Sequence, residues 1–264
     1  MRAALRTPAR AYTWSMRLLA LVLVFLLGQL AFDTAFTKLW PHVYPLLGLT
    51  DLTNQQHPWI ILYANHAWEV IIALLVIVAF GGRGWREWGG LVLKQPPLSL
   101  RLVRGFTLFA ILSMLALHIT LRLLGTPFPL AVNLTPLDIT AHLLFELVVS
   151  GVSEEIWFRG MDQSILGANW TGVLRMGKLE LPVAGMLAAL VFGIGHLPFT
   201  IAPPWASPNL ANPFTLLNAF VAFLLGLYYA WTRRRTGDIW AAAAAHGIFN
   251  FVSAAVMIAL AMAG

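Results

Sequence analysis

Two adjacent glutamates, Glu154 and Glu155, and an arginine, Arg159, stand at the end of a long apolar run. Each charge at the depth of a bilayer costs roughly 2.5–3.5 kcal/mol on insertion scales, so a membrane helix gains no stability from them. Such residues are therefore candidates for a functional site. Glu155 and Arg159 are four apart and share a helix face, whereas Glu154 is rotated by about 100° and needs a different partner.

Candidate partners for Glu154 occur in two other apolar segments. His196 ends one of them, and His246 and Asn250 lie four apart on one face of the last. A carboxylate near an imidazole can hold a water molecule and remove its proton. A second imidazole and a carboxamide can donate hydrogen bonds to a developing oxyanion. Together these groups could hydrolyse an amide through a tetrahedral intermediate.

The composition indicates an integral membrane protein that positions these groups on helices. Of the 264 residues, 59% are hydrophobic and 11% are charged, against about 25% charged in soluble domains. We expect an all-α, polytopic membrane bundle with about seven transmembrane helices and a single domain, 1–264. The apolar runs lie at about 14–32, 58–80, 103–124, 137–158, 183–198, 213–232 and 238–262.

The basic residues fall almost entirely on one side of this bundle. With seven spans, Arg2, Arg83, Arg175 and Arg233 all mark that side, and only Lys38 and Arg122 lie near the other. The positive-inside rule then predicts a cytoplasmic N-terminus. We expect a multi-pass protein of the plasma membrane. The net charge of +6 does not indicate a nucleic-acid partner, because the basic residues separate apolar segments instead of forming one polar face. The absence of cysteine excludes a thiolate nucleophile or metal ligand.

The order of the three polar motifs resembles that of a known family. Glu-Glu-x-x-x-Arg, Phe-x-x-x-His and His-x-x-x-Asn, on successive membrane helices, are typical of the CPBP family, which contains the type II CAAX prenyl endopeptidases and the Abi-type intramembrane proteases. The matching positions are Glu154, Glu155, Arg159, Phe192, His196, His246 and Asn250. The resemblance covers about 140–255, the expected catalytic core, and leaves the N-terminal helices of 1–135 without an assigned role.

The resemblance implies an intramembrane endopeptidase that acts on a membrane-associated protein or peptide within the lipid bilayer. Glu154 would activate a water molecule that His196 helps to hold, and His246 and Asn250 would stabilise the oxyanion. The remaining motif positions would orient the site or pack beside it: Glu155, Arg159 and Phe192.

The role of a metal stays open at this point. Two histidines and a glutamate form a legitimate catalytic zinc set, and here they would be Glu154, His196 and His246. However, the one-turn H-E-x-x-H motif is absent, and an oxyanion role needs the second histidine unligated. We favour a glutamate-dependent mechanism with no firm cofactor, and a Zn²⁺-dependent version of the same protease is the alternative.

A transporter is the alternative from another class of protein. The residues that could form a proton relay are His142, Glu146, Glu154 and His196. Transporters of this kind often contain inverted repeats, and no repeat is evident here. A serine protease is disfavoured, because Ser153 has no Ser-His-Asp or rhomboid-like context.

Several polar residues inside the spans lie outside the family motifs. A stripe at four-residue steps precedes Glu154, and three further polar residues lie in the second span. We interpret them as a water-filled path or as interhelical hydrogen bonds, with a substrate-access channel or a second ion site as the sharper hypothesis. They are His142, Glu146 and Ser150 in the stripe, and Asn65, His66 and Glu69 in the second span.

Overall fold

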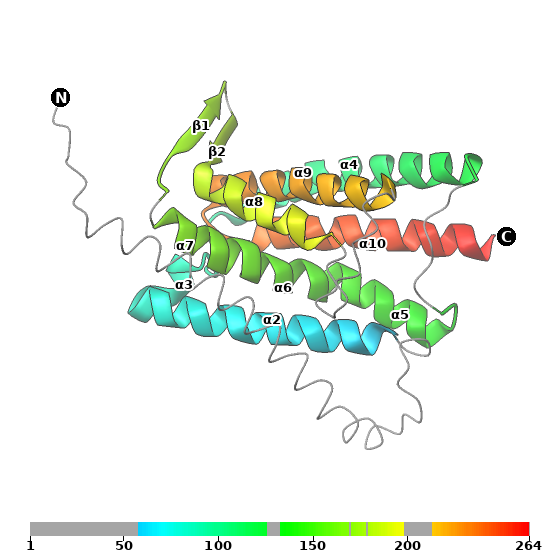
Figure 1. The fold of residues 1–264 in the computed structure, drawn as a ribbon, viewed down its shortest axis with the longest axis horizontal. Helices are drawn as coiled ribbons and strands as arrows, with labels where there is room; N and C mark the ends of the chain where they lie inside the picture. The colour runs from blue at the N-terminus through cyan, green and yellow to red at the C-terminus, as the bar shows by residue number, and fades with distance from the viewer. Residues whose placement is uncertain (1–57, 126–132, 169, 178, 198–212, 264) are drawn as a thin grey trace, which may run out of the picture. The chain divides into compact units, whose positions relative to one another are not determined.

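The computed structural model describes residues 58–125, 133–168, 170–177, 179–197 and 213–263, which belong to one compact unit. These residues are almost entirely helical (Figure 1). The expected membrane helix at 14–32 lies outside the described residues, and the predicted cytoplasmic N-terminus lies there too. The long helices are α2 (Pro58–Gly81), α4 (Pro96–Leu123), α9 (Pro213–Thr236) and α10 (Trp240–Met262).

Five helical stretches of the described chain are long and apolar enough to cross a membrane. They are Leu62–Trp88, Pro96–Leu123, Pro136–Gly167, Leu216–Thr236 and Trp240–Met262. A shorter apolar helix, α8, spans Val183–Gly195. Large apolar side chains on these helices, such as Leu75, Leu108 and Leu112, have more than half of their surface exposed, as expected for a surface that faces lipid. The polytopic helical fold is confirmed, and the count of seven spans stays a prediction.

The stretch Pro136–Gly167 is one continuous helical path with two widened turns. It comprises α5 (Pro136–Leu144), a π-helical turn (Phe145–Ser150), α6 (Gly151–Glu155), a second π-helical turn (Ile156–Asp162) and α7 (Gln163–Gly167). Its first residue is a proline at N1, and the preceding Thr135 accepts a hydrogen bond from the Asp138 amide at 3.1 Å. The two π turns flank the Glu154-Glu155 pair, and π turns occur often at functional sites.

Helix α10 packs against α4, α9 and the 145–155 part of this helical path, and α8 lies along α9 (Figure 1). Small residues make the approach close: a Cβ atom on Gly151 would lie 2.6 Å from both the Ala243 oxygen and the Gly247 nitrogen. Phe106, Phe192 and Tyr229 are buried in the core between α4, α8, α9 and α10. The 145–155 segment is therefore held directly against the histidine-bearing turn of α10.

Two short connections complete the described fold. A short helix, α3 (Trp85–Trp88), follows a single 3₁₀ turn (Gly82–Gly84) after α2. Strands β1 (Val173–Met176) and β2 (Leu179–Pro182) form an antiparallel hairpin that leads into α8, with Val173 opposite Pro182. Gly177, in the connection between the strands, has a φ of +60°, which glycine adopts without strain.

Candidate active site

The Glu155 carboxylate is fully buried and is held by Arg159 from one turn along the same helix. Arg159 Nε lies 3.3 Å from Glu155 Oε2, and neither side chain is exposed. The pairing that their spacing predicts is therefore present. Arg159 Nη2 also donates to the Gly226 carbonyl of α9 at 2.8 Å, where a glycine is needed because a Cβ would lie 2.9 Å from that nitrogen.

Aromatic rings complete the surroundings of Arg159. Its guanidinium carbon lies 4.9 Å from the centre of the Phe192 ring and 5.3 Å from that of Tyr229. Phe192 is one of the motif positions, and it lies buried as expected for a packing residue. The arginine is thus fixed by an ion pair, a backbone carbonyl and two ring faces, so it can serve as a rigid anchor for Glu155.

Glu155 also contacts His246 on α10, an interaction that the sequence did not indicate. His246 Nδ1 lies 3.1 Å from Glu155 Oε1, while Arg159 occupies the other oxygen. The imidazole stacks on the Tyr229 ring at 4.9 Å with an interplanar angle of 17°. An ionised Glu155 can only accept, so the Nδ1–H of His246 points to it. The other ring nitrogen, Nε2, is thereby directed away from Glu155.

The Glu154 side chain points into a different set of partners, as the rotation between neighbouring helix positions predicts. Its Oε2 lies 3.9 Å from His246 Nε2, and its Oε1 accepts a hydrogen bond from Ser150 Oγ at 3.0 Å. The Glu154 side chain is 15% exposed, whereas that of Glu155 is 0% exposed. Of the two acids, Glu154 is therefore the one that water can reach.

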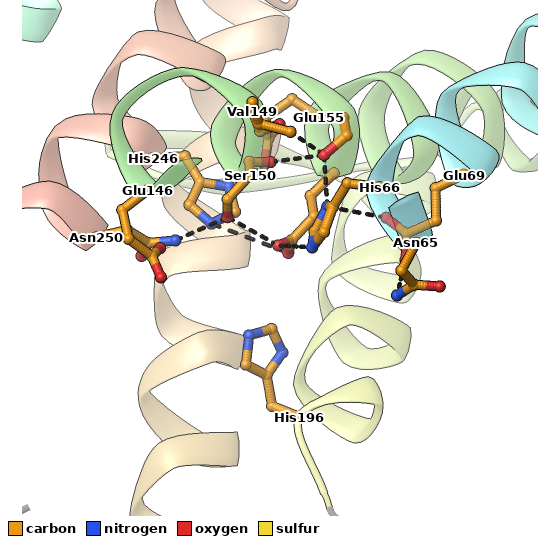
Figure 2. A network of polar contacts seen from close by, with 12 residues as sticks. Asn65, His66, Glu69, Glu146, Val149, Ser150, Glu155, His196, His246 and Asn250 are labelled. Carbon is orange, nitrogen blue, oxygen red and sulfur yellow. Dashed lines mark hydrogen bonds and ion pairs between the residues drawn. The ribbon is translucent and has the colours of Figure 1, made fainter. Parts of the chain in front are cut away.

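Asn250 reaches Glu154 through a serine. Asn250 Nδ2 donates to Ser150 Oγ at 3.0 Å, and Ser150 donates in turn to Glu154 (Figure 2). Asn250 is also in hydrogen-bonding contact with the Glu146 carboxylate. The Asn250 carboxamide is thus linked to Glu154 through Ser150. Its present partners, Ser150 and Glu146, both belong to the polar stripe on the helical path Pro136–Gly167.

His196 is the predicted site residue that takes no part in the hydrogen-bonded network drawn in Figure 2. It follows α8 directly, its Nδ1 donates to the Phe192 carbonyl at 2.8 Å, and its ring packs edge-on against the Phe192 ring at 4.6 Å. Figure 2 shows it apart from the hydrogen-bonded network. It is close enough to interact electrostatically with Glu154. The structure therefore brings Glu154, Glu155, Arg159, His246 and Asn250 into one network, with His196 at its side.

Residues 136–252, from the start of α5 to the middle of α10, match the family model described as Type II CAAX prenyl endopeptidase Rce1-like. This part of the chain belongs to the Rce1-like family. The match contains all three polar motifs and confirms the resemblance inferred from the sequence. Searches of curated proteins and of solved structures found no match. The family is one of CAAX-type endopeptidases, and together with the membrane-spanning helices this match supports a multi-pass membrane peptidase that acts on peptides.

A zinc ion does not fit the donor atoms of this Rce1-like site as they are placed. Among the residues that the structure describes, no three histidine, aspartate or glutamate side chains are arranged to hold a metal ion. Of the three expected ligands, His196 directs Nδ1 to a backbone carbonyl and stands apart from His246 (Figure 2). No step of the mechanism proposed for this Rce1-like protein is therefore routed through a metal.

Two residues of α2 join the Rce1-like site from outside the matched segment. His66 Nδ1 lies 2.6 Å from Ser153 Oγ and 3.1 Å from Glu69 Oε2, and His66 Nε2 lies 4.0 Å from Glu154 Oε1. From the sequence they were interpreted as part of a water-filled path or of interhelical hydrogen bonds, with a substrate-access channel or a second ion site as the sharper hypothesis. The signal in the sequence was a histidine and a glutamate three apart inside an apolar span. Ionisable residues are costly in lipid, so their presence there indicates a functional site.

Proposed function

We propose that this Rce1-like protein is an intramembrane endopeptidase in which Glu154 activates the attacking water. The observation that carries the proposal is the contrast within the acidic pair. Glu155 is sealed between Arg159 and His246, whereas Glu154 retains exposure and faces the imidazole at 3.9 Å. Glu154 therefore has the access that a general base requires, and Glu155 has the rigidity of a support.

The distances around Glu154 suit a bound water. A separation of 3.9 Å between Glu154 Oε2 and His246 Nε2 is too long for a direct hydrogen bond, so a water beside them could contact both. Glu154 would take a proton from that water as its oxygen attacks the scissile carbonyl carbon. The C–N bond then breaks, and the same proton passes from Glu154 to the leaving amine.

His246 and Asn250 would stabilise the oxyanion that forms in this step. Because the Nδ1–H of His246 is directed to Glu155, its Nε2 can donate only when the ring is an imidazolium. Each ring nitrogen of His246 faces a carboxylate, Nδ1 that of Glu155 at 3.1 Å and Nε2 that of Glu154 at 3.9 Å. Asn250 would turn one N–H from its present partner, Ser150, toward the oxyanion.

His196 would act on the water from the other side. Donation from its Nδ1 to the Phe192 carbonyl leaves Nε2 as an acceptor, which can receive a hydrogen bond from water. This arrangement supports the water-holding role that the family resemblance implies for His196. The proposed substrates are tails or segments of membrane-associated proteins, and a prenylated CAAX peptide is the first one to test.

The test uses the full chain in liposomes with a membrane-anchored peptide offered with and without a prenyl group. We expect Glu154→Gln to lower kcat by about 10²–10⁴-fold and His246→Ala by about 10²–10³-fold. Glu180→Gln, at an exposed ion pair on the β1–β2 hairpin, is the matched control and should keep wild-type activity. Activity that survives Glu154→Gln would refute the proposed base.

A chelator arm of the same experiment separates the two protease mechanisms. We expect cleavage to continue after treatment with a chelator, with no gain when Zn²⁺ is restored. Activity that is lost on chelation and recovered with Zn²⁺ would favour the zinc-dependent alternative. The comparison is made on wild-type protein, so it does not depend on the folding of any variant.

A further inference from the structure

A second imidazole faces Glu154 from α2, opposite the contact with His246. His66 Nε2 lies 4.0 Å from Glu154 Oε1, and His246 Nε2 lies 3.9 Å from Oε2 of the same carboxylate. The base proposed for the reaction is therefore bracketed by two ring nitrogens at nearly equal distances. His66 is outside residues 136–252, so the family match does not account for it.

We propose that His66 is a further catalytic residue, whose Nε2 accepts a hydrogen bond from the water that Glu154 deprotonates. This inference rests on the proposed role of Glu154. A separation of 4.0 Å is again too long for a direct hydrogen bond and suits a water that contacts both groups. Both residues are partly accessible, with side-chain exposures of 11% for His66 and 15% for Glu154.

The hydrogen bonds of Ser153 fix which nitrogen of His66 carries the proton. Ser153 Oγ donates to the carbonyls of Val149 at 2.7 Å and Ser150 at 3.1 Å, so its single proton is already used. Its oxygen can then accept from His66 Nδ1, which lies at 2.6 Å, and the nearby Glu69 carboxylate, which can only accept, places the proton on that nitrogen. With its proton on Nδ1, a neutral His66 presents a lone pair on Nε2, on the side of Glu154. That is the acceptor that an attacking water needs.

The remaining neighbours hold the ring in this orientation. Glu69 Oε2 lies 3.1 Å from His66 Nδ1, one turn along α2, and favours a proton on that nitrogen. The Phe145 ring packs edge-on against the imidazole, with ring centres 4.8 Å apart. His66 therefore combines an oriented donor, a packed ring and a free acceptor, the arrangement of a preorganised histidine.

Because Glu154 takes one proton of the water, a single O–H is left to donate, so His66 would take the acceptor role proposed above for His196. His196 stands apart from the network that joins His66, Ser150 and His246 (Figure 2). Its Nδ1 is bonded to the carbonyl of Phe192, its own neighbour one turn back, and not to another helix. Water held by His66 and Glu154 would lie between α2 and α6. Helix α2 would thus supply a catalytic side chain to the site in addition to packing against it.

The competing interpretation is that His66 merely ties α2 to α6 through Ser153. Two conservative substitutions separate the interpretations, because each keeps one ring nitrogen. Asparagine places an amide nitrogen near Nδ1 and can still donate to Ser153, whereas glutamine reaches the position of Nε2 and can present an oxygen to water. We expect kcat to fall about 100-fold in His66→Asn and less than about 10-fold in His66→Gln, with KM nearly unchanged.

The measurement is kcat and KM for the membrane-anchored peptide in liposomes, with the thermal midpoint of each variant recorded alongside. His118→Leu is the matched control: His118 is also buried, bonds a serine on another helix, Ser253, at 3.0 Å, and has no part in the site. It should keep wild-type kcat. Full activity in His66→Asn, or a loss in both variants that follows their thermal midpoints, would overturn the proposal.

Two further variants keep the outcome decisive. Ser153→Ala leaves His66 in place but removes the acceptor that orients its Nδ1 proton, and we expect kcat to fall about 10-fold. Unchanged kcat in a folded Ser153→Ala protein counts against the proposal. This test holds even if no His66 variant folds. Glu154→Gln is measured in the same series. An active Glu154→Gln protein overturns both proposals, whereas an inactive one beside a fully active His66→Asn overturns only the role of His66.

Discussion

Replacement of Arg159 by methionine should be strongly destabilising, because it leaves a carboxylate buried without its main partner. The ion pair spans 3.3 Å, and both side chains are fully buried. Breaking such a pair from one side costs about 3–5 kcal/mol. His246 still contacts Glu155 in the variant, so we expect the low end of that range, about 3 kcal/mol of unfolding free energy.

The double variant Glu155→Gln/Arg159→Met isolates the electrostatic part of this loss. Removing both charges leaves no buried unpaired ion, so we expect an unfolding free energy within about 2 kcal/mol of the wild type. Activity should nevertheless stay about 100-fold low, because residue 155 then lacks the carboxylate that orients the His246 imidazole. The double variant would then regain stability without regaining activity.

The assay is reversible denaturant unfolding in mixed micelles, with peptide cleavage measured on the same samples. Arg175→Met is the matched control, since Arg175 pairs with Glu180 at the same 3.3 Å but is 72% exposed. We expect that control to lose less than about 1 kcal/mol. Equal losses in the two arginine variants would refute the reasoning, because they would show that burial of the pair does not set its contribution.

Three further outcomes follow from contacts in the site. Gly151→Ala should destabilise the protein by about 1–3 kcal/mol and reduce cleavage, because its Cβ would meet the α10 backbone at 2.6 Å; Gly105→Ala, with open space around it, should be neutral or stabilising in the same unfolding assay. Ser150→Ala should lower kcat about 10-fold without a change in the thermal midpoint beyond a few degrees, since Ser150 donates to Glu154. Tyr229→Phe should keep wild-type kcat and equal or greater stability, because the buried Tyr229 hydroxyl has no hydrogen-bond partner in the described structure; a clear loss of either would show that the hydroxyl has a role.

The helical period was enough to predict the partner of Glu155 and the different direction of Glu154. A spacing of four placed Glu155 with Arg159, and the rotation of one residue placed Glu154 elsewhere. The family and the polytopic helical fold also followed from the sequence, because motif order and apolar runs are local features. The catalytic roles of the site residues, the plasma membrane location and the cytoplasmic N-terminus stay predictions.

The contacts between distant helices were not predictable in the same way. The bond between Glu155 and His246 joins positions 91 residues apart, and that between His66 and Ser153 joins positions 87 residues apart. No motif records these distances, because they depend on how α2 and α10 pack against the helix of 136–167. The π turns on either side of Glu154 also alter side-chain directions, and no sequence pattern predicts them.

The two oxygens of Glu155 serve different ends, and this has a consequence for relatives that have lost activity. One oxygen neutralises a buried arginine that the fold depends on, and the other orients the imidazole of the site. A descendant that no longer cleaves peptides would still need Glu155 and Arg159 to remain folded, but it would be free to exchange Glu154. Glu154, and not Glu155 or Arg159, is therefore the position that should separate working enzymes from inactive copies.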